Sequence, residues 1–293
     1  MIFHTLICVA DATNCNYRIA ESDIQLAIPP TRCVCGMEIS MQILKGFIIA
    51  VSIYSNIPVP QFEWEKEDMK YMMCFFPVVG AVIGATVYLW TIVSNKLSID
   101  RLCYIFIMMA IPLIITGGFH IDGFMDTMDA FHSYQPREEK LKILKDSHIG
   151  AFAVIMLVLY GLIYAGAISQ IQDIKLLKIL CFGFFLSRCL SGIGVVMLKP
   201  AKEDGMLNSF AGNSKKNTVK IVLFIQSTFC IWGMMHESFA GGGLIAMAAV
   251  LSFVYYGYRT KKLLGGITGD TAGYFILICE VCMAVTAAVV AIF

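Results

Sequence analysis

The chain has 293 residues, of which 58% are hydrophobic and 15% are charged, and its mean hydropathy is +0.74. Soluble domains carry about 25% charged residues, so this composition excludes a disordered chain and favours a protein that lies in a membrane. The net charge of +1 offers no basic surface for nucleic acid, and the 11 scattered cysteines indicate no disulfide framework.

Residues 1–40 differ in character from the rest of the chain. They hold four cysteines and two consecutive prolines but no continuous apolar run, and residues 1–10 lack the basic start of a signal peptide. We expect this stretch to be a variable extension, or to precede a translation start at Met37 or Met41. The membrane domain is then expected to comprise residues 41–293.

Long runs without charge predict membrane-spanning helices, because about 20 apolar residues cross the hydrocarbon layer as a helix. Uncharged runs of 18 to 24 residues occupy residues 71–93, 102–119, 149–172 and 238–258. Weaker spans are expected at residues 45–57, 179–198, 221–235 and 271–293. The alternation typical of a barrel is absent, so we expect an all-α polytopic bundle of seven or eight transmembrane helices, with Gly80 and Gly84 forming a GxxxG pair in the second.

The distribution of basic residues predicts the orientation of this bundle. If residues 45–57 form the first of eight spans, the odd-numbered loops hold 14 Lys and Arg residues and the even-numbered loops hold 4. This excess places the odd-numbered loops in the cytoplasm. Arg188 and Glu280 are single charges within their spans, and such residues usually face the bundle interior. We expect Arg188 either to pair with Glu280 or to reach a substrate phosphate.

An aspartate-rich segment follows the third span, at residues 117–130 (GGFHIDGFMDTMDA). If it is helical, Asp122, Asp126 and Asp129 fall at i, i+4 and i+7 and share one face. The opposite face is apolar and consists of Phe124, Met128 and Phe131. The pattern therefore predicts an amphipathic cytoplasmic helix with three converging carboxylates.

Three carboxylates held close together repel one another unless a cation is present. Hard oxygen ligands favour Mg²⁺, which typically binds one or two carboxylates, several waters and the phosphates of a substrate. At a membrane surface this indicates a site for a nucleotide or diphosphate substrate. The alternative is a solvated acidic turn rich in Asp and Gly.

Polar residues in two neighbouring loops join the candidates. In residues 145–148 (KDSH), Asp146 or Ser147 can cap the fourth span, while Lys145 and His148 can contact phosphate, or Lys145 is only a membrane anchor. His120 is a weaker candidate, because on an ideal helix it points away from Asp122.

The loop before the last span, residues 265–270 (GGITGD), combines glycines with an aspartate. Glycine lets a backbone approach a ligand closely, so Asp270 is a candidate to join the metal site. The same sequence also fits a simple turn.

Residues 117–129 together with residues 145–152 (KDSHIGAF) resemble the signature of the cobalamin synthase family. Further matches lie at residues 57–60 (IPVP), 76–84 (FPVVGAVIG), 187–188 (SR) and 266–273 (GITGDTAG). The resemblance covers roughly residue 41 to the C-terminus.

The resemblance implies an integral membrane enzyme, an adenosylcobinamide-GDP ribazoletransferase. Such an enzyme transfers the cobinamide phosphate of adenosylcobinamide-GDP to α-ribazole or its 5′-phosphate and releases GMP, with Mg²⁺ as cofactor. It further implies a cytoplasmic (inner) membrane location with the site on the cytoplasmic side, and leaves open a homo-oligomer or an association with other cobalamin-assembly enzymes. Asp122, Asp126 and Asp129 are then expected to bind magnesium, one of them acting as base. The residues expected to contact substrate are His120, Lys145, Asp146, His148, Arg188 and Asp270, and Glu280 is structural or unassigned.

Two other classes of protein fit parts of the pattern. Membrane transferases of the CDP-alcohol type usually show Asp-Gly followed by Ala-Arg, which is missing after Asp122-Gly123, and membrane prenyltransferases use two aspartate-rich loops. A transporter would use Arg188 and Glu280 along its path, but it leaves the concentration of carboxylates in one loop unexplained.

Overall fold

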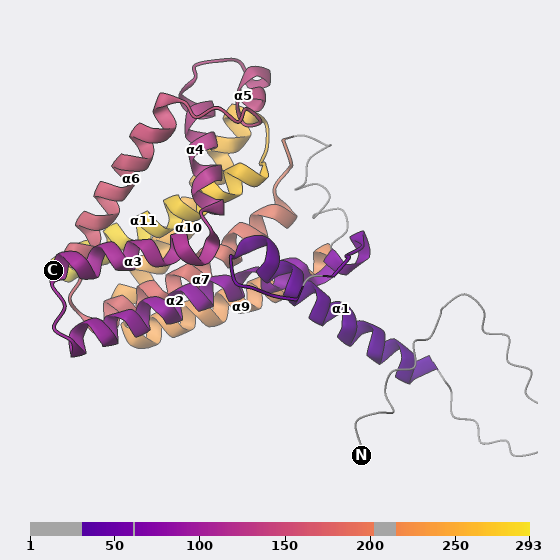
Figure 1. Ribbon diagram of the computed structural model, residues 1–293, viewed down its shortest axis with the longest axis horizontal. Helices are drawn as coiled ribbons and strands as arrows, with labels where there is room; N and C mark the ends of the chain where they lie inside the picture. Colours follow the sequence, from indigo (N-terminus) through magenta and orange to yellow (C-terminus); the bar gives the residue numbers. More distant parts are fainter. Residues whose placement is uncertain (1–30, 61, 202–214) are drawn as a thin grey trace, which may run out of the picture. The chain divides into compact units, whose positions relative to one another are not determined.

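The computed structural model describes residues 31–60, 62–201 and 215–293 (Figure 1). In these ranges the chain is helical, and the only strand-like pairing is an isolated bridge between Pro200 and Ile267. The all-α prediction is therefore confirmed. The expectations for residues 1–30 lie outside the described residues. The chain divides after Glu38 into an N-terminal unit and a unit of residues 39–293 that holds every helix from α2 onward.

The helices follow one another with short connections. In chain order they are α1 (Thr31–Tyr54), the 3₁₀ helix η1 (Lys66–Tyr71), α2 (Met72–Lys96), α3 (Arg101–Thr116), α4 (Phe119–His132), α5 (Arg137–Ile143), α6 (Ala151–Gln170), α7 (Ile174–Met197), α9 (Lys216–Glu237), α10 (Phe239–Leu264) and α11 (Gly269–Ile292).

Six of the described helices are long and apolar enough to cross a membrane: α2 together with most of η1, α6, α7, α9, α10 and α11. The pair α3 and α4 brings the count to seven if the two are one broken span, and residues 41–54 of α1 form a shorter apolar helix. A count of seven is the lower end of the predicted seven or eight spans, whereas a count of six falls one short of it.

The third predicted span, residues 102–119, ends three residues early at a sharp bend. Gly117 and Gly118 both adopt left-handed backbone conformations, with φ of 62° and 82°, and α4 leaves α3 at an angle of 95°. Only glycine adopts such angles without strain, so the Gly-Gly pair directs α4 out of the line of α3. We therefore treat α4 as lying outside the six spans.

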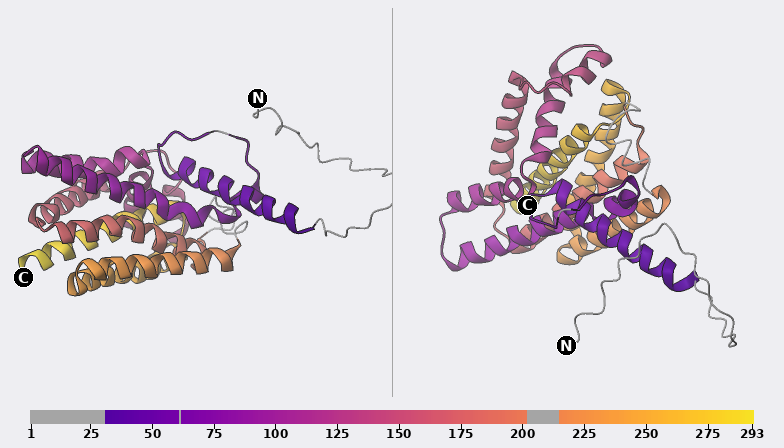
Figure 2. Two further views of the ribbon diagram at one scale, coloured as in Figure 1. Left: turned by 90° about the horizontal axis from the view of Figure 1, so that it is seen from below. Right: turned by 45° about the vertical axis from the view of Figure 1, so that its right-hand side comes forward.

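The predicted GxxxG pair forms the contact between α2 and α7. A Cβ at Gly80 would collide with the carbonyl oxygen of Phe184, and one at Gly84 with that of Cys181. The missing side chains let the two backbones touch, as small residues do in membrane helix pairs. Figures 1 and 2 show α2, α7 and α9 side by side, and α7 is the most buried of the six spans.

The loops of the bundle gather at two ends. At one end, the Lys215 amide donates to the Lys70 carbonyl oxygen (3.3 Å), and Pro200 pairs with Ile267. The third loop joins them, because Arg137 donates to the Ala201 carbonyl oxygen (3.1 Å). All four loops predicted to be rich in Lys and Arg therefore meet at the same end of the bundle.

Candidate active site at the aspartate-rich helix

Helix α4 carries the three predicted aspartates and packs chiefly against α11 (Figure 1). Two glycines bring the helices together. A Cβ on Gly123 would lie 2.7 Å from the carbonyl oxygen of Asp270, and one on Gly273 would lie 3.1 Å from that of His120. Because backbone touches backbone here, Asp270 in the first turn of α11 lies beside the aspartates of α4.

The two faces of α4 have different surroundings. Phe124, Met128 and Phe131 are buried in the core, whereas Asp122 is exposed and Asp126 is partly buried. Phe124 packs against Tyr274 of α11 in a stacked arrangement, with ring centroids 6.0 Å apart. The apolar face thus holds α4 on the bundle while Asp122 and Asp126 remain accessible.

The carboxylates at this site share one electrostatic field. Burial raises the pKa of Asp126 to about 6, and the negative charges of Asp122, Asp270 and Asp129 add to this effect. In the described ranges, none of Asp122, Asp126 and Asp270 forms an ion pair with a basic side chain. Among the described residues, no basic side chain therefore relieves the repulsion between these carboxylates.

Asp129 has a different environment from the other two aspartates of α4. Its Oδ2 accepts a hydrogen bond from the Gly150 amide (2.6 Å) and its Oδ1 accepts one from the Ala153 amide (2.8 Å). These amides belong to the N-terminus of α6, which carries free donors and a positive dipole end. Asp129 therefore caps α6 from a neighbouring helix.

The prediction that Asp146 or Ser147 caps this helix is wrong. Helix α6 begins only at Ala151, and no side chain of its own loop caps it. Asp146 instead accepts hydrogen bonds from the ring Nδ1 (2.6 Å) and the backbone amide (3.1 Å) of His148. These hydrogen bonds lower the pKa of Asp146. Lys145, Asp146 and His148 all lie exposed in the loop between α5 and α6.

No three His, Cys, Asp or Glu side chains among the described residues converge closely enough to hold a metal ion by themselves. The capping role of Asp129 gives a physical reason, because both of its oxygens already accept short hydrogen bonds. The carboxylates left free to bind a cation are those of Asp122 and Asp126, with Asp270 beside them.

The two predicted intramembrane charges pair with each other. Arg188 and Glu280 are 1% and 6% exposed and form an ion pair through Arg188 Nη1. The same nitrogen donates to Ser187 Oγ (2.9 Å) and to the Phe184 carbonyl oxygen (3.1 Å). This guanidinium is thus engaged inside the bundle, next to buried His120, rather than directed to the exposed face of Asp122.

An open hollow of about 620 Å³ adjoins the aspartate face. The turn between α3 and α4, the end of α1 and the side chain of Asp122 line it. Asn56 also lines it and was missed from the sequence, although it directly precedes residues 57–60, which carry part of the family resemblance. That adjacency was the one available signal.

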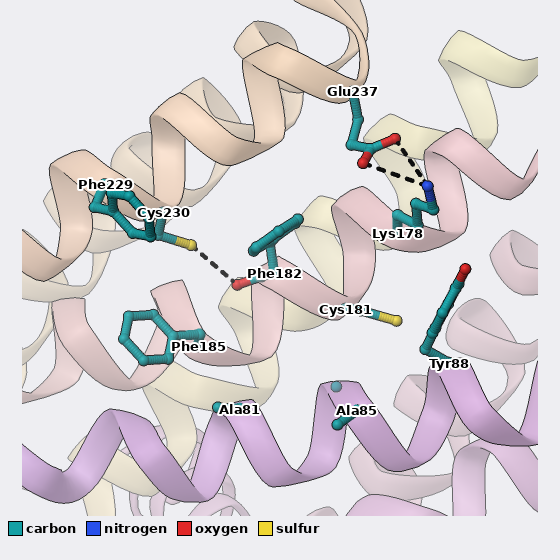
Figure 3. A pocket seen from close by; sticks show the side chains of 11 residues that line it. Ala81, Ala85, Tyr88, Lys178, Cys181, Phe182, Phe185, Phe229, Cys230 and Glu237 are labelled. Atoms are coloured by element: carbon teal, nitrogen blue, oxygen red, sulfur yellow. Dashed lines mark hydrogen bonds and ion pairs between the residues drawn. The ribbon is translucent and has the colours of Figure 1, made fainter.

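A second hollow, of about 440 Å³, lies between α2, α7 and α9 (Figure 3). Its walls are mostly apolar, and its polar end is the ion pair of Lys178 with Glu237, 3.4 Å apart. Lys178 is near the start of α7, whereas Pro200, just past its end, pairs with Ile267 near Asp270. Since α7 is about 36 Å long, this ion pair lies at the opposite end of the bundle from the aspartates.

Comparison with known proteins identifies a family. The model of the cobalamin-5-phosphate synthase family matches residues 46–288. A protein of Lachnoclostridium phytofermentans named adenosylcobinamide-GDP ribazoletransferase is 41% identical over 251 residues, which cover 86% of this chain and 95% of that protein. Proteins with the same name from Clostridium perfringens (34% identical, 80% of this chain and 94% of theirs) and a Geobacillus species (28%, 79% and 90%) are also similar. No solved structure matches.

Proposed function

The chain belongs to the cobalamin-5-phosphate synthase family, and from this premise we propose that it is an adenosylcobinamide-GDP ribazoletransferase of the membrane. The observation that supports this proposal best is a group of carboxylates, Asp122, Asp126 and Asp270, that form no ion pair with any described residue and lie beside an open hollow at the end of the bundle where the basic loops meet. Carboxylates repel an anionic diphosphate substrate, so the two can lie together only if a cation binds between them.

In the proposed reaction, a ribose hydroxyl of α-ribazole, or of its 5′-phosphate, attacks the phosphorus that bears the cobinamide. A new oxygen–phosphorus bond forms, the bond to the bridging oxygen breaks, and GMP leaves with that oxygen. The hydroxyl proton passes to one of the carboxylates. A phosphoryl centre of this kind needs positioning and charge neutralisation more than covalent help from the protein.

We assign the Mg²⁺ ligands to Asp122 and Asp126, with Asp270 as a further oxygen donor. This donor set fits, since magnesium takes one or two carboxylates and fills its other positions with water and substrate phosphate. The ion would neutralise the charge that develops on the phosphate oxygens. Asp129 is assigned a positioning role, because it ties α4 to the start of α6.

Loop contacts support a cytoplasmic position for this site. The third loop, which follows α4, meets the fifth through Arg137 and Ala201, and the fifth meets the first through Lys215 and Lys70. Loops rich in Lys and Arg stay in the cytoplasm. A topology reporter fused after Pro136 is expected to report cytoplasm, and a signal from the opposite side would reverse the proposed orientation.

The proposal is tested with the purified protein, adenosylcobinamide-GDP, α-ribazole and Mg²⁺, by following GMP and the joined corrinoid product. We expect product only when magnesium is present and a loss of at least about 100-fold in kcat/KM for Asp122→Ala. Glu138→Ala is the matched control, because Glu138 is an exposed carboxylate in α5 at the same end of the bundle. Absence of product from the unaltered protein would defeat the function, whereas full activity of Asp122→Ala would defeat only the site.

A further inference from the structure

A separate cavity of about 240 Å³ lies inside the bundle behind α4. Side chains of α3, α4, α6, α7 and α11 line it, and most of this lining is apolar, as at Leu113, Leu157 and Leu277. Tyr160 and Tyr164 of α6 add an aromatic wall, with their rings stacked 5.7 Å apart and 10° from parallel. The open hollow at Asp122 lies next to it.

Two side chains of this cavity, His120 and Arg188, carry buried nitrogen atoms with no hydrogen-bond partner among the described residues. His120 is 4% exposed, and neither of its ring nitrogens forms a hydrogen bond. Arg188 is 1% exposed, and its Nε is likewise unpaired although its Nη1 is fully engaged. Buried polar atoms almost always have a partner, so these atoms indicate a ligand or water that completes the cavity.

The size and polarity of the cavity favour one part of the proposed substrates. An apolar cavity of about 150 Å³ holds benzene, so 240 Å³ has room for a fused bicyclic ring. Guanine has several polar edges to satisfy, whereas the walls are mostly apolar and the one carboxylate among them, that of Glu280, is already paired with Arg188; unpaired polar edges are costly. The base of α-ribazole, 5,6-dimethylbenzimidazole, is an apolar bicycle with one free ring nitrogen, and a single donor satisfies it. A small hollow of about 60 Å³, which His120 also lines, has room for water.

We propose that this cavity is the binding site for the benzimidazole base of α-ribazole, an inference that rests on the proposed function. The cavity and the open hollow share Thr116 and Ile121 in their walls. A base held in the cavity therefore has its ribose directed toward the hollow, where Asp122 is exposed. His120 donates to the free ring nitrogen of the base, and the pair of tyrosines contacts the ring system.

The test fills the cavity from Gly161 of α6. Gly161 lines the cavity, and a Cβ there would have only Met109 Cε within 4.0 Å, so a larger side chain enters free space. Gly161→Leu is compared with Gly166→Leu, the same change on the same helix at an exposed position with no neighbouring atom within 4 Å. We expect Gly161→Leu to raise the KM for α-ribazole at least about tenfold, while the KM for adenosylcobinamide-GDP stays within about twofold.

A second readout separates this effect from a general folding defect. The α-ribosides of benzimidazole and of 5,6-dimethylbenzimidazole differ by two methyl groups, so a narrowed cavity is expected to reject the larger base more strongly. Gly161→Ala adds one methyl group and so narrows the cavity less, and it is expected to give a smaller shift of base preference in the same direction. Gly166→Leu is expected to leave the preference unchanged.

The outcomes distinguish the inference from the function on which it rests. Turnover by Gly161→Leu and Gly161→Ala with unchanged base preference, or with equal rises of both KM values, would overturn the base site and leave the transferase assignment intact. Equilibrium dialysis of labelled α-ribazole needs no turnover. Binding that Gly161→Leu abolishes and Gly166→Leu retains supports the base site, even if the unaltered protein released no GMP and the proposed function failed.

Discussion

The capping contact of Asp129 allows its role to be separated from that of the other aspartates. Asp129→Ala removes two hydrogen bonds from a charged acceptor to the first amides of α6. Loss of a helix N-cap costs about 0.5–2 kcal/mol, and hydrogen bonds to charged groups contribute about 1.5–3 kcal/mol. Partial hydration of the freed amides offsets part of this, so we expect a loss of about 2 kcal/mol in the free energy of unfolding.

A loss of about 2 kcal/mol lowers Tm by about 4–8 °C in a unit of this size, which thermal unfolding in detergent resolves. Asp129→Asn retains one acceptor oxygen and is expected to recover about half of the stability, together with most of kcat and an unchanged magnesium requirement. Asp173→Ala is a matched control, because Asp173 caps α7 at the opposite end of the bundle. Asp173→Ala is expected to lower Tm and to leave kcat and KM unchanged.

Either of two results would contradict this role of Asp129. If Asp129→Ala unfolds at the same temperature as the unaltered protein, the contact with α6 does not stabilise the fold. If Asp129→Asn keeps its stability but loses activity as completely as Asp122→Ala, then Asp129 binds the cation and the cap is incidental.

Three further predictions concern packing, charge and pH. Gly84→Val is expected to prevent close contact of α2 with α7 and to lower the free energy of unfolding by more than about 3 kcal/mol. Ala85→Val, beside the open hollow of Figure 3, is expected to leave the stability nearly unchanged in the same thermal-unfolding assay. Glu280→Ala is expected to lower the free energy of unfolding by about 3–5 kcal/mol, because it leaves a buried cation unpaired. Combining it with Arg188→Met is expected to restore part of that loss. Strictly additive effects of the two substitutions would contradict the pairing. Because the pKa of Asp126 is raised to about 6, the folded state holds a proton that the unfolded state releases near pH 4, so metal-free stability is expected to fall as pH rises from about 4 to 6. Asp126→Asn should flatten that slope, and an unchanged slope would exclude this carboxyl as its source.

Local patterns predicted the helices well because each span depends on its own apolar run. The end of α3 departs from its prediction: composition extends that run to Phe119, but the left-handed angles at Gly117 and Gly118 end the helix earlier. A Gly-Gly pair shows in sequence that a bend is allowed, whereas its direction depends on what α4 packs against.

The carboxylates of the candidate site were only partly predictable for the same reason. Helical spacing placed Asp122, Asp126 and Asp129 on one side of a helix, but it could not reveal that a helix starting at Ala151 would draw Asp129 into its own first turn. The approach of Asp270 depends on Gly123, whose missing side chain has meaning only once α11 lies against α4. Contacts between distant segments follow from packing, which no local pattern encodes.

The contact of Gly123 with Asp270 also bears on when the site can form during synthesis of the chain. Asp122 and Asp126 emerge from the ribosome well before α11, the last helix, which supplies both the neighbouring carboxylate and the surface on which α4 rests. A nascent or truncated chain without α11 therefore has the aspartate helix and its contacts with α6, but lacks the helix against which α4 chiefly packs. We therefore expect the site to be complete only when the final span has entered the membrane, so that incomplete chains do not consume the activated corrinoid.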